Sequence, residues 1–380
     1  MKTSTFAFET WLVELTANYL WSGLRPFIGR HLSRRCKNCV LSEACSPINA
    51  AGLCAECEAY LAAGGDKFAA TEPGKEDELD RIIREAQHTG GGEYDALVLF
   101  SGGKDSSYMV HRILHDFPDL RVLTLMVDTG FMSPYALENA RRALDRFDVA
   151  HMTYRVKTSV VRKAFHYTLT HLDTQTGYTI VDTMDAFLIF DSASILAARM
   201  QIPLVICGLS KVQSENIFGL TGYEFPRRGQ GSKVSDYVQI DLDTVFDADE
   251  RAAFWDEARW PQERIARFLF PYCVWELDEE FILREVDRLK LIDRRRSRPL
   301  MTNNALIPVI GMAEVARFGY SSFEVEFARM VREGKSDRRY WLHIFEMLEY
   351  STKTGRFINK TVEETLEKLG LTKRDIGISH

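Results

Sequence analysis

The sequence predicts an α/β protein with an open parallel sheet, preceded by a small cysteine-rich segment and followed by a helical region. Apolar runs of strand length alternate with helical periodicity between residues 94 and 208, and a polar or glycine-rich turn follows each strand. Two closely spaced cysteine pairs predict the separate N-terminal segment. We therefore divide the chain into residues 1–35, 36–60, 61–93, 94–245 and 246–380.

The composition is that of an ordinary globular chain. Its 380 residues are 46% hydrophobic, which suffices for two or three domains, and the formal net charge is −6. A dedicated nucleic-acid binder would show a basic surplus, so the charge argues against that class. No apolar run approaches the roughly 20 residues that cross a bilayer. Glu9 and Glu14 also interrupt the apolar N-terminal stretch, so we expect no membrane span, no signal peptide and a cytoplasmic location.

The alternation places the elements in order along the chain. The predicted strands are 96–100, 121–127, 151–156 and 203–207, with helices at 81–87, 108–115, 134–147 and 184–200. Strand-helix-strand crossovers are right-handed, so the carboxyl ends of the strands share one edge, where ligands bind. After Trp255 the pattern predicts helices alone, at 278–289, 313–318, 323–331 and 340–350.

The loop Ser101-Gly-Gly-Lys-Asp-Ser-Ser107 connects the first strand to its helix. Its two glycines permit positive φ and close approach of a ligand, and the first N–H groups of the helix point toward a bound anion. Asp105 can hold Mg²⁺, and Lys104 can steady a phosphoryl group. The loop lacks the Walker A and dinucleotide-binding spacings. The predicted phosphate site comprises Phe100, Ser101, Gly102, Gly103, Lys104, Asp105, Ser106 and Ser107.

Two other strands end in candidate site residues. Val127 and Asp128 end the second strand, and Asp128 either meets the ribose or base edge of the nucleotide or caps a turn. Cys207 and Gly208 end the fourth strand. Cys207 is either a small buried side chain or a nucleophile that carries sulfur, with nearby Lys211 able to lower its pKa.

The cysteine pairs Cys36-Lys-Asn-Cys39 and Cys54-Ala-Glu-Cys57 are separated by fourteen residues. This spacing lets four thiolates surround Zn²⁺ tetrahedrally, and it fits a reducing compartment better than a disulfide framework does. An iron–sulfur cluster uses the same ligands, but zinc is favoured. Cys45 lies between the pairs as a spare thiol or a replacement ligand.

Two segments beside these sites carry basic residues. The stretch 219–235, with Arg227, Arg228 and Lys233, is expected to be a flap over the triphosphate or a solvated loop. Near the N-terminus, Phe8, Leu12, Leu15 and Tyr19 share helical spacing, and arginines follow at 25, 30, 34 and 35. Such a helix lies on a membrane or a partner, or covers the core of its own protein. The last is favoured, because the acidic residues do not suit an anionic bilayer.

The loop resembles the PP-loop, Ser-Gly-Gly-x-Asp-Ser, of the ATP pyrophosphatase superfamily, whose members bind ATP and cleave it between the α and β phosphates. The resemblance implies a sheet of the adenine-nucleotide alpha hydrolase (HUP-like) type, with ATP and Mg²⁺. Over about residues 36–350 the chain resembles the N-acetyl sugar amidotransferase family. The matching blocks are the cysteine pairs, the loop with Val127-Asp-Thr-Gly-Phe131, and Phe318-Gly-Tyr with Val331-Arg-Glu-Gly-Lys335.

The family resemblance implies a reaction in which a carbonyl oxygen of an N-acetyl sugar is adenylated and ammonia from a partner glutaminase displaces AMP, for surface polysaccharide. The chain departs from the family at Cys207-Gly-Leu-Ser-Lys211, where Trp-Gly-Glu is expected, and in residues 1–35. The alternative is a PP-loop sulfur transferase that uses Cys207 on a nucleobase or small-molecule carbonyl, supplied by a cysteine desulfurase. Iron–sulfur thiolases, however, place Cys-x-x-Cys where this chain has Asp182-Thr-Met-Asp185.

Two non-enzymatic hypotheses stay open at this level. The cysteine pairs and the basic stretch would suit a nucleic-acid-binding module, and the loop alone would suit an ATP sensor that does not cleave its ligand. The acidic balance and the complete loop favour an enzyme over both. A homodimer is also compatible with the sequence.

Overall fold

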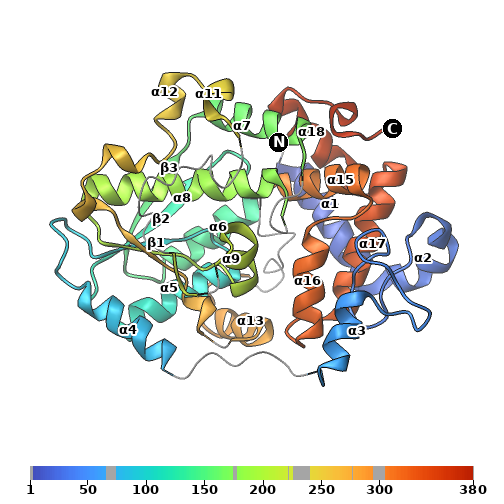
Figure 1. Cartoon of the computed structure of the whole chain (residues 1–380), viewed down its shortest axis with the longest axis horizontal. Helices are drawn as coiled ribbons and strands as arrows, with labels where there is room; N and C mark the ends of the chain where they lie inside the picture. Colours follow the sequence, from blue (N-terminus) through green and yellow to red (C-terminus); the bar gives the residue numbers. More distant parts are fainter. Residues whose placement is uncertain are drawn as a thin grey trace.

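A six-stranded sheet lies in one half of the molecule, with strand order β3-β2-β1-β4-β6-β5 (Figure 1). The computed structural model describes residues 3–65, 74–173, 178–220, 222–225, 240–275, 277–293 and 304–379. All neighbouring strands are parallel except β5, which runs antiparallel to β6. The strands are β1 Ala96–Leu99, β2 Val122–Asp128, β3 Ala150–Arg155, β4 Leu204–Ile206, β5 Glu224–Phe225 and β6 Arg267–Leu269.

Helices cover both faces of the sheet, because the central strands are apolar at every position. In β1, Leu97 and Leu99 pack into the hydrophobic cluster that contains α7 and α8, whereas Ala96 and Val98 pack into the cluster that contains α4, α5 and α13. The helices that flank the sheet are α4 Lys75–Glu85, α5 Lys104–Asp116, α6 Pro134–Leu144, α7 Thr158–Thr170, α8 Ile180–Met200, α9 Lys211–Phe218 and α13 Glu279–Arg288.

The order of the strands reverses beside β1. The chain passes from β1 to β2 and β3 on one side, and β4 then pairs with the opposite edge of β1. Such a switch point leaves a crevice at the carboxyl ends of the two central strands, which is where open α/β sheets bind ligands. The loop at residues 101–107 lies at this crevice.

The N-terminal and C-terminal segments pack together beside the sheet (Figure 1). The Trp21 indole donates to Glu346 at 2.8 Å, and the buried Arg35 pairs with Glu324 at 3.0 Å and Glu349 at 3.2 Å. The N-terminal helices are α1 Thr3–Leu15, η1 Thr16–Leu20, α2 Trp21–Ile28, η2 Gly29–His31 and α3 Ala55–Ala62. The C-terminal helices are α15 Leu306–Phe318, α16 Phe323–Arg332, α17 Arg338–Thr354, α18 Asn359–Leu369 and η7 Lys373–Ile376.

The fold confirms the predicted α/β class and corrects several elements. The expectation of no strand after Trp255 is wrong, because β6 pairs with β4 inside the sheet. Helix α8 begins at Ile180 rather than Met184, since Thr179 and Asp182 form a capping box. The sequence pattern also missed α7, α9 and α18. Short helical turns connect β5 to α13: α11 Leu242–Val245, α12 Ala248–Arg251, η3 Glu257–Arg259, η4 Gln262–Arg264 and η5 Pro271–Cys273.

Two further expectations concern loops and membrane spans. Arg227, Arg228 and Lys233 of the expected flap lie outside the described residues. Among the helices that the structure describes, none is both long enough and apolar enough to cross a bilayer.

Candidate functional site

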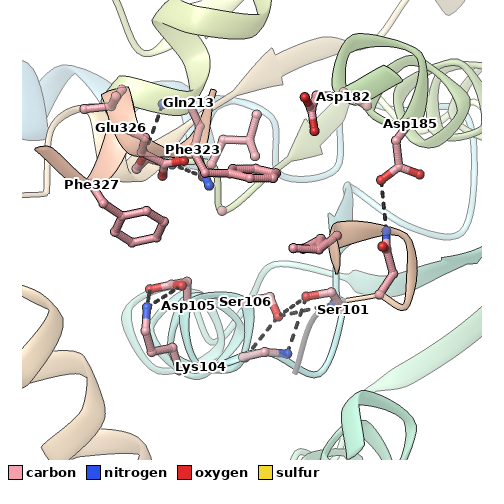
Figure 2. Close-up of a pocket in the computed structure, with 18 of the residues that line it drawn as sticks. Ser101, Lys104, Asp105, Ser106, Asp182, Asp185, Gln213, Phe323, Glu326 and Phe327 are labelled. Carbon is pink, nitrogen blue, oxygen red and sulfur yellow. Dashed lines mark hydrogen bonds and ion pairs between the residues drawn. The ribbon is translucent and has the colours of Figure 1, made fainter. Parts of the chain in front are cut away.

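A cavity of about 550 Å³ lies between the carboxyl edge of the sheet and the C-terminal helices α15, α16 and α17. Figure 2 shows the loop residues on one side of this cavity, with Asp182, Asp185 and Glu326 across from them. Of the residues predicted from the sequence, the cavity is lined by Phe100, Ser101, Gly103, Lys104, Asp105, Ser106, Val127, Cys207 and Gly208. Gly102, Ser107 and Asp128 do not line it, and neither do the four cysteines Cys36, Cys39, Cys54 and Cys57.

The loop at residues 101–107 is ordered by its own serines. The backbone N–H of Ser101 donates to the Ser106 hydroxyl oxygen at 3.2 Å, and the Ser106 hydroxyl donates to the Gly103 carbonyl at 3.2 Å. The two hydroxyls lie 3.1 Å apart. Helix α5 starts at Lys104, so the N–H groups of its first turn have no carbonyl partner within the helix. This turn lines the cavity. An anion at this position would complete their hydrogen bonding.

The two glycines of the loop do different things. Gly102 has φ of +76°, and a Cβ there would lie 2.2 Å from the Ala136 carbonyl oxygen in α6. Gly103 is extended, with φ of −79°, so the expectation of positive φ is right only for Gly102. A Cβ at Gly103 would lie 3.4 Å from the Ser101 hydroxyl oxygen, on the cavity side of the loop.

This difference predicts opposite outcomes for two alanine substitutions. Gly102→Ala should push the loop away from α6, because the new Cβ would clash with the Ala136 carbonyl. We expect the free energy of unfolding to fall by about 1–3 kcal/mol and ATP binding to be lost. Gly103→Ala, the matched control, should leave the unfolding free energy within about 1 kcal/mol of wild type. Chemical denaturation and ATP titration measure both quantities. Equal stability of the two variants would contradict the account of Gly102.

Lys104 and Asp105 form an ion pair at the start of α5. The Lys104 ammonium lies 2.7 Å from Asp105 Oδ2 and 3.7 Å from a Glu279 carboxylate oxygen. Burial acts to lower the pKa of Lys104, but the charges of Asp105 and Glu279 outweigh it, so the pKa is raised and the ammonium stays charged. The Tyr272 hydroxyl donates to the Asp105 carbonyl at 2.7 Å and holds this turn in place. The Asp105 side chain is 45% exposed, so its carboxylate faces the cavity.

Asp128 makes the contacts of a turn cap. Its carboxylate accepts from the Gly130 N–H at 2.7 Å and pairs with Arg155 of β3. Neither contact leads into the cavity, whereas the neighbouring Val127 and Thr129 line it. The turn-capping alternative therefore describes Asp128 in this structure, and contact with a nucleotide stays a prediction.

Cys207 lies at the end of β4 and is 7% exposed. Burial raises the pKa of its thiol to about 12, so the thiol is protonated near neutral pH. The expectation that Lys211 lowers this pKa is not met, because the lysine charge lowers the pKa of Cys273 instead. Cys273 is half-buried, and its thiol donates to the Ser214 hydroxyl at 3.7 Å.

Three carboxylates across the cavity were not assigned to the site from the sequence. Burial raises the pKa of Asp185 to about 6, and the Asn304 amide donates to this carboxylate at 3.1 Å. Burial also raises the pKa of Glu326 to about 7, while the Tyr178 hydroxyl donates to it. Asp182 lies one turn before Asp185 on α8. The spacing of the two aspartates was visible in the sequence, but nothing in it placed Glu326 of α16 beside them.

The raised pKa of Glu326 predicts a pH-dependent stability. The folded-state pKa of about 7 lies above the ordinary glutamate pKa of 4.5, so the folded state binds the proton more tightly. The corresponding stability is present below about pH 4.5 and is lost as pH rises to about 7, by on the order of 3 kcal/mol. Glu326→Gln should flatten this part of the profile, whereas the exposed Glu280→Gln should not. Denaturation at pH 5 and 7.5 tests this, and an unchanged profile in Glu326→Gln would contradict it.

The four predicted metal ligands meet in one buried cluster. Cys36, Cys39, Cys54 and Cys57 place their sulfur atoms within 4.8 Å of one another. The hydrogen bond between Cys39 and Cys57 lowers the pKa of the Cys57 thiol and raises the pKa of the Cys39 thiol, which favours a thiolate at Cys57. The donor set fits a tetrahedral thiolate-bound ion such as Zn²⁺. Cys45 is not part of the cluster.

The comparisons with known proteins identify no family. No family model matches the chain, and no curated protein is significantly similar in sequence. Similar solved structures include the U34-tRNA thiolase NcsA from Methanococcus maripaludis with its 4Fe-4S cluster, at 13% identity over 92% of this chain and 94% of that one, with a TM-score of 0.33.

Two synthetases are similar to the same extent. NMN synthetase from Francisella tularensis has 12% identity over 78% of this chain and 95% of that one, with a TM-score of 0.35. The NH3-dependent NAD synthetase from Campylobacter jejuni has 14% identity over 74% of this chain and 95% of that one, with a TM-score of 0.33. At these identities the likenesses concern the fold alone.

Proposed function

We propose that this chain is an ATP-dependent enzyme that transfers AMP to a carbonyl oxygen, releases pyrophosphate and lets a nitrogen nucleophile displace the AMP. The observation that carries the proposal is the loop Ser101–Ser107, which opens at the switch point of the sheet into a cavity of about 550 Å³. The cavity has room for an acceptor beside a nucleotide. Lys104 and Asp105 lie where the phosphates would be bound, next to that acceptor space.

The loop would hold the pyrophosphate that leaves. The N–H groups at the start of α5 and the hydroxyl groups of Ser101 and Ser106 donate to the β and γ phosphates. Asp105 is the carboxylate that would hold Mg²⁺, which neutralises charge on the phosphates when bound. Lys104 would stabilise the charge on the α-phosphoryl group when Mg²⁺ at Asp105 weakens the ion pair between this aspartate and the lysine.

Adenylation makes the carbonyl carbon a better electrophile and turns its oxygen into a good leaving group. An amide carbonyl is a poor electrophile, and its oxygen leaves poorly. When that oxygen attacks the α-phosphorus, the bond from this phosphorus to the pyrophosphate oxygen breaks. Ammonia then adds to the carbon, the bond between carbon and the AMP oxygen breaks, and the extra proton passes to a cavity carboxylate or to water. The product is an amidine, and AMP departs with the former carbonyl oxygen.

An N-acetyl sugar is the acceptor that the cavity wall favours. Phe323 and Phe327 of α16 present aromatic rings, and Asp182 and Asp185 present carboxylates, around the space opposite the loop (Figure 2). Rings of this kind pack against the C–H faces of a sugar, while carboxylates accept hydrogen bonds from its hydroxyl groups. A partner glutaminase would supply ammonia, and ammonium salt would replace it in an assay.

Oxygen labelling tests the proposed reaction. The enzyme is incubated with ATP, ammonium and an N-acetylated nucleotide sugar that carries ¹⁸O in its acetyl carbonyl. We expect one AMP and one pyrophosphate for each amidine formed, with the label in AMP. The sugar without its acetyl group is the control and should give neither product. Formation of ADP and phosphate, or unlabelled AMP, would contradict the proposal.

Cys207 separates the nitrogen reaction from the sulfur alternative. A buried thiol with a pKa of about 12 is a poor persulfide carrier, which favours nitrogen. We therefore expect Cys207→Ser to keep at least about half of the wild-type rate of pyrophosphate release, because it changes packing alone. Cys273→Ser is the matched control. Loss of activity in Cys207→Ser with unchanged stability would instead support a sulfur transferase.

A further inference from the structure

The first 28 residues carry an unusual share of the exposed apolar surface. Of the eight large hydrophobic side chains that are exposed among the described residues, six lie here. They are Phe8, Trp11, Tyr19, Leu20, Leu24 and Phe27, and we call them the N-terminal outer face. Phe27 is 82% exposed and Tyr19 is 77% exposed. Leaving such side chains in water is unfavourable, and concentrations of them mark interaction surfaces.

The opposite face of the same helices covers the core of the protein. Phe6, Val13, Ala17 and Trp21 are buried. Of the helical face expected from the sequence, Phe8 and Tyr19 are exposed, whereas Leu12 and Leu15 are half-buried. The π-helical turn η1 shifts the helical phase between α1 and α2, so that Trp21 points inward while Tyr19 and Leu20 stay outside. Helix α2 extends from the edge of the molecule beyond α17 (Figure 1), and Trp21 is its one buried residue.

Both acidic residues of this segment are engaged with the rest of the protein. Glu9 is buried and accepts from the backbone N–H groups of Lys360 and Thr361, where it caps α18. Glu14 accepts from the Tyr340 hydroxyl at 2.6 Å. The sequence-based objection to an anionic bilayer, which rested on these carboxylates, therefore does not apply to the outer face.

The charges that remain on the exposed side are positive. Arg25, Arg30 and Arg34 are exposed. Arg25 is paired with Glu346, but among the described residues neither Arg30 nor Arg34 makes an ion pair within 4.0 Å. Residues 5–31 thus present tryptophan, tyrosine and phenylalanine next to arginine without an exposed carboxylate of their own, and the exposed Glu43 beside them accepts from the Arg34 N–H at 3.1 Å. This is the composition of an interfacial membrane helix.

From this arrangement we propose that the N-terminal outer face binds the surface of an anionic lipid bilayer. The aromatic side chains enter the boundary between headgroups and acyl chains, and the arginines contact lipid phosphates. The helices lie in the interface without crossing the membrane. This inference is independent of the reaction proposed for the cavity.

Vesicle flotation with the full chain tests the proposal. Vesicles of phosphatidylcholine with 30% phosphatidylglycerol should bind the protein, and pure phosphatidylcholine vesicles should bind it at least about fivefold more weakly. The double substitution Trp11→Ser, Phe27→Ser should lower binding to the anionic vesicles at least about tenfold, since both side chains are exposed and their loss leaves the core intact. Leu137→Ser is the control. It removes an exposed leucine in α6, outside the N-terminal outer face, and should bind like wild type.

The outcomes that overturn the proposal are distinct. Wild-type protein that fails to bind anionic vesicles would refute it, as would equal binding by the double variant. Sedimentation without lipid examines the other occupant, a second copy of the chain. A wild-type dimer that the double substitution converts to a monomer would assign the face to self-association. Circular dichroism and chemical denaturation confirm that the variant is folded in each case.

Discussion

Asp105→Ala is expected to lower pyrophosphate release on the order of a hundred- to a thousandfold. The substitution removes the carboxylate that would hold Mg²⁺ against the departing phosphates. It also removes the closest partner of the Lys104 ammonium, at 2.7 Å, and leaves Glu279 at 3.7 Å. Because the Asp105 side chain is 45% exposed, we expect the fold to persist. A pyrophosphate assay at saturating ATP and circular dichroism measure the two effects.

Two controls separate charge from position. Asp105→Asn keeps the size of the side chain and should be almost as inactive, because an amide replaces a charged oxygen ligand. Asp116→Asn changes the last residue of the same helix, which pairs with Arg112, and should keep most of the activity. Undiminished pyrophosphate production by Asp105→Ala would refute the role of the carboxylate, and loss of activity in Asp116→Asn would point to general damage to α5.

Removal of one cluster cysteine is expected to unfold the cysteine-rich segment 36–60. Cys54→Ser would replace one of four sulfur atoms that lie within 4.8 Å of one another. Structural zinc sites contribute about 10–16 kcal/mol in small peptides, so the segment 36–60 should lose both its metal and its order. Metal analysis and amide exchange of residues 36–60 measure these effects. We expect zinc to be near-stoichiometric in wild type and largely absent from the variant.

Cys45→Ser is the matched control for this experiment. Cys45 lies in the same segment but outside the cluster, so its substitution should leave the metal content unchanged. The order of the segment matters beyond its own residues, because Arg338 of α17 donates to the carbonyls of Cys36 and Cys39 at 2.7 and 2.9 Å. Full zinc content in Cys54→Ser would contradict the ligand assignment, and an iron-containing brown preparation would replace zinc with a cluster.

Local patterns predicted the parts of the site whose geometry is local. The loop Ser101–Ser107 is predictable because the hydrogen bonds of its serines, the positive φ of Gly102 and the start of α5 all lie within seven residues. The contact of Gly102 with α6 comes from the tertiary structure. The cysteine pairs are predictable for the same reason, since their spacing restricts where four sulfur atoms can meet. The sheet itself follows from apolar runs such as Ala96–Leu99, which are buried at every position.

Strand β6 could not be predicted from the local sequence pattern. Arg267–Leu269 is too short for a period of two to be visible. What makes it a strand is its pairing with β4, more than sixty residues earlier in the chain, where Leu204 lies opposite Arg267. The residues around position 267 do not indicate which strand they pair with, so only the tertiary structure shows that this strand is β4.

The sequence by itself determined that this chain has a glycine- and serine-rich loop between a buried strand and a helix, and a four-cysteine cluster. The tertiary structure decided which side chains face each other: Glu326 across the cavity from the loop, Lys104 on Asp105, and Glu9 and Glu14 turned inward beneath an aromatic surface. The physical reason is the range of the forces involved. The conformation of a turn and the spacing of metal ligands depend on a few neighbouring residues. Burial and charge pairing depend on segments that can be more than three hundred residues apart, as for Glu14 and Tyr340.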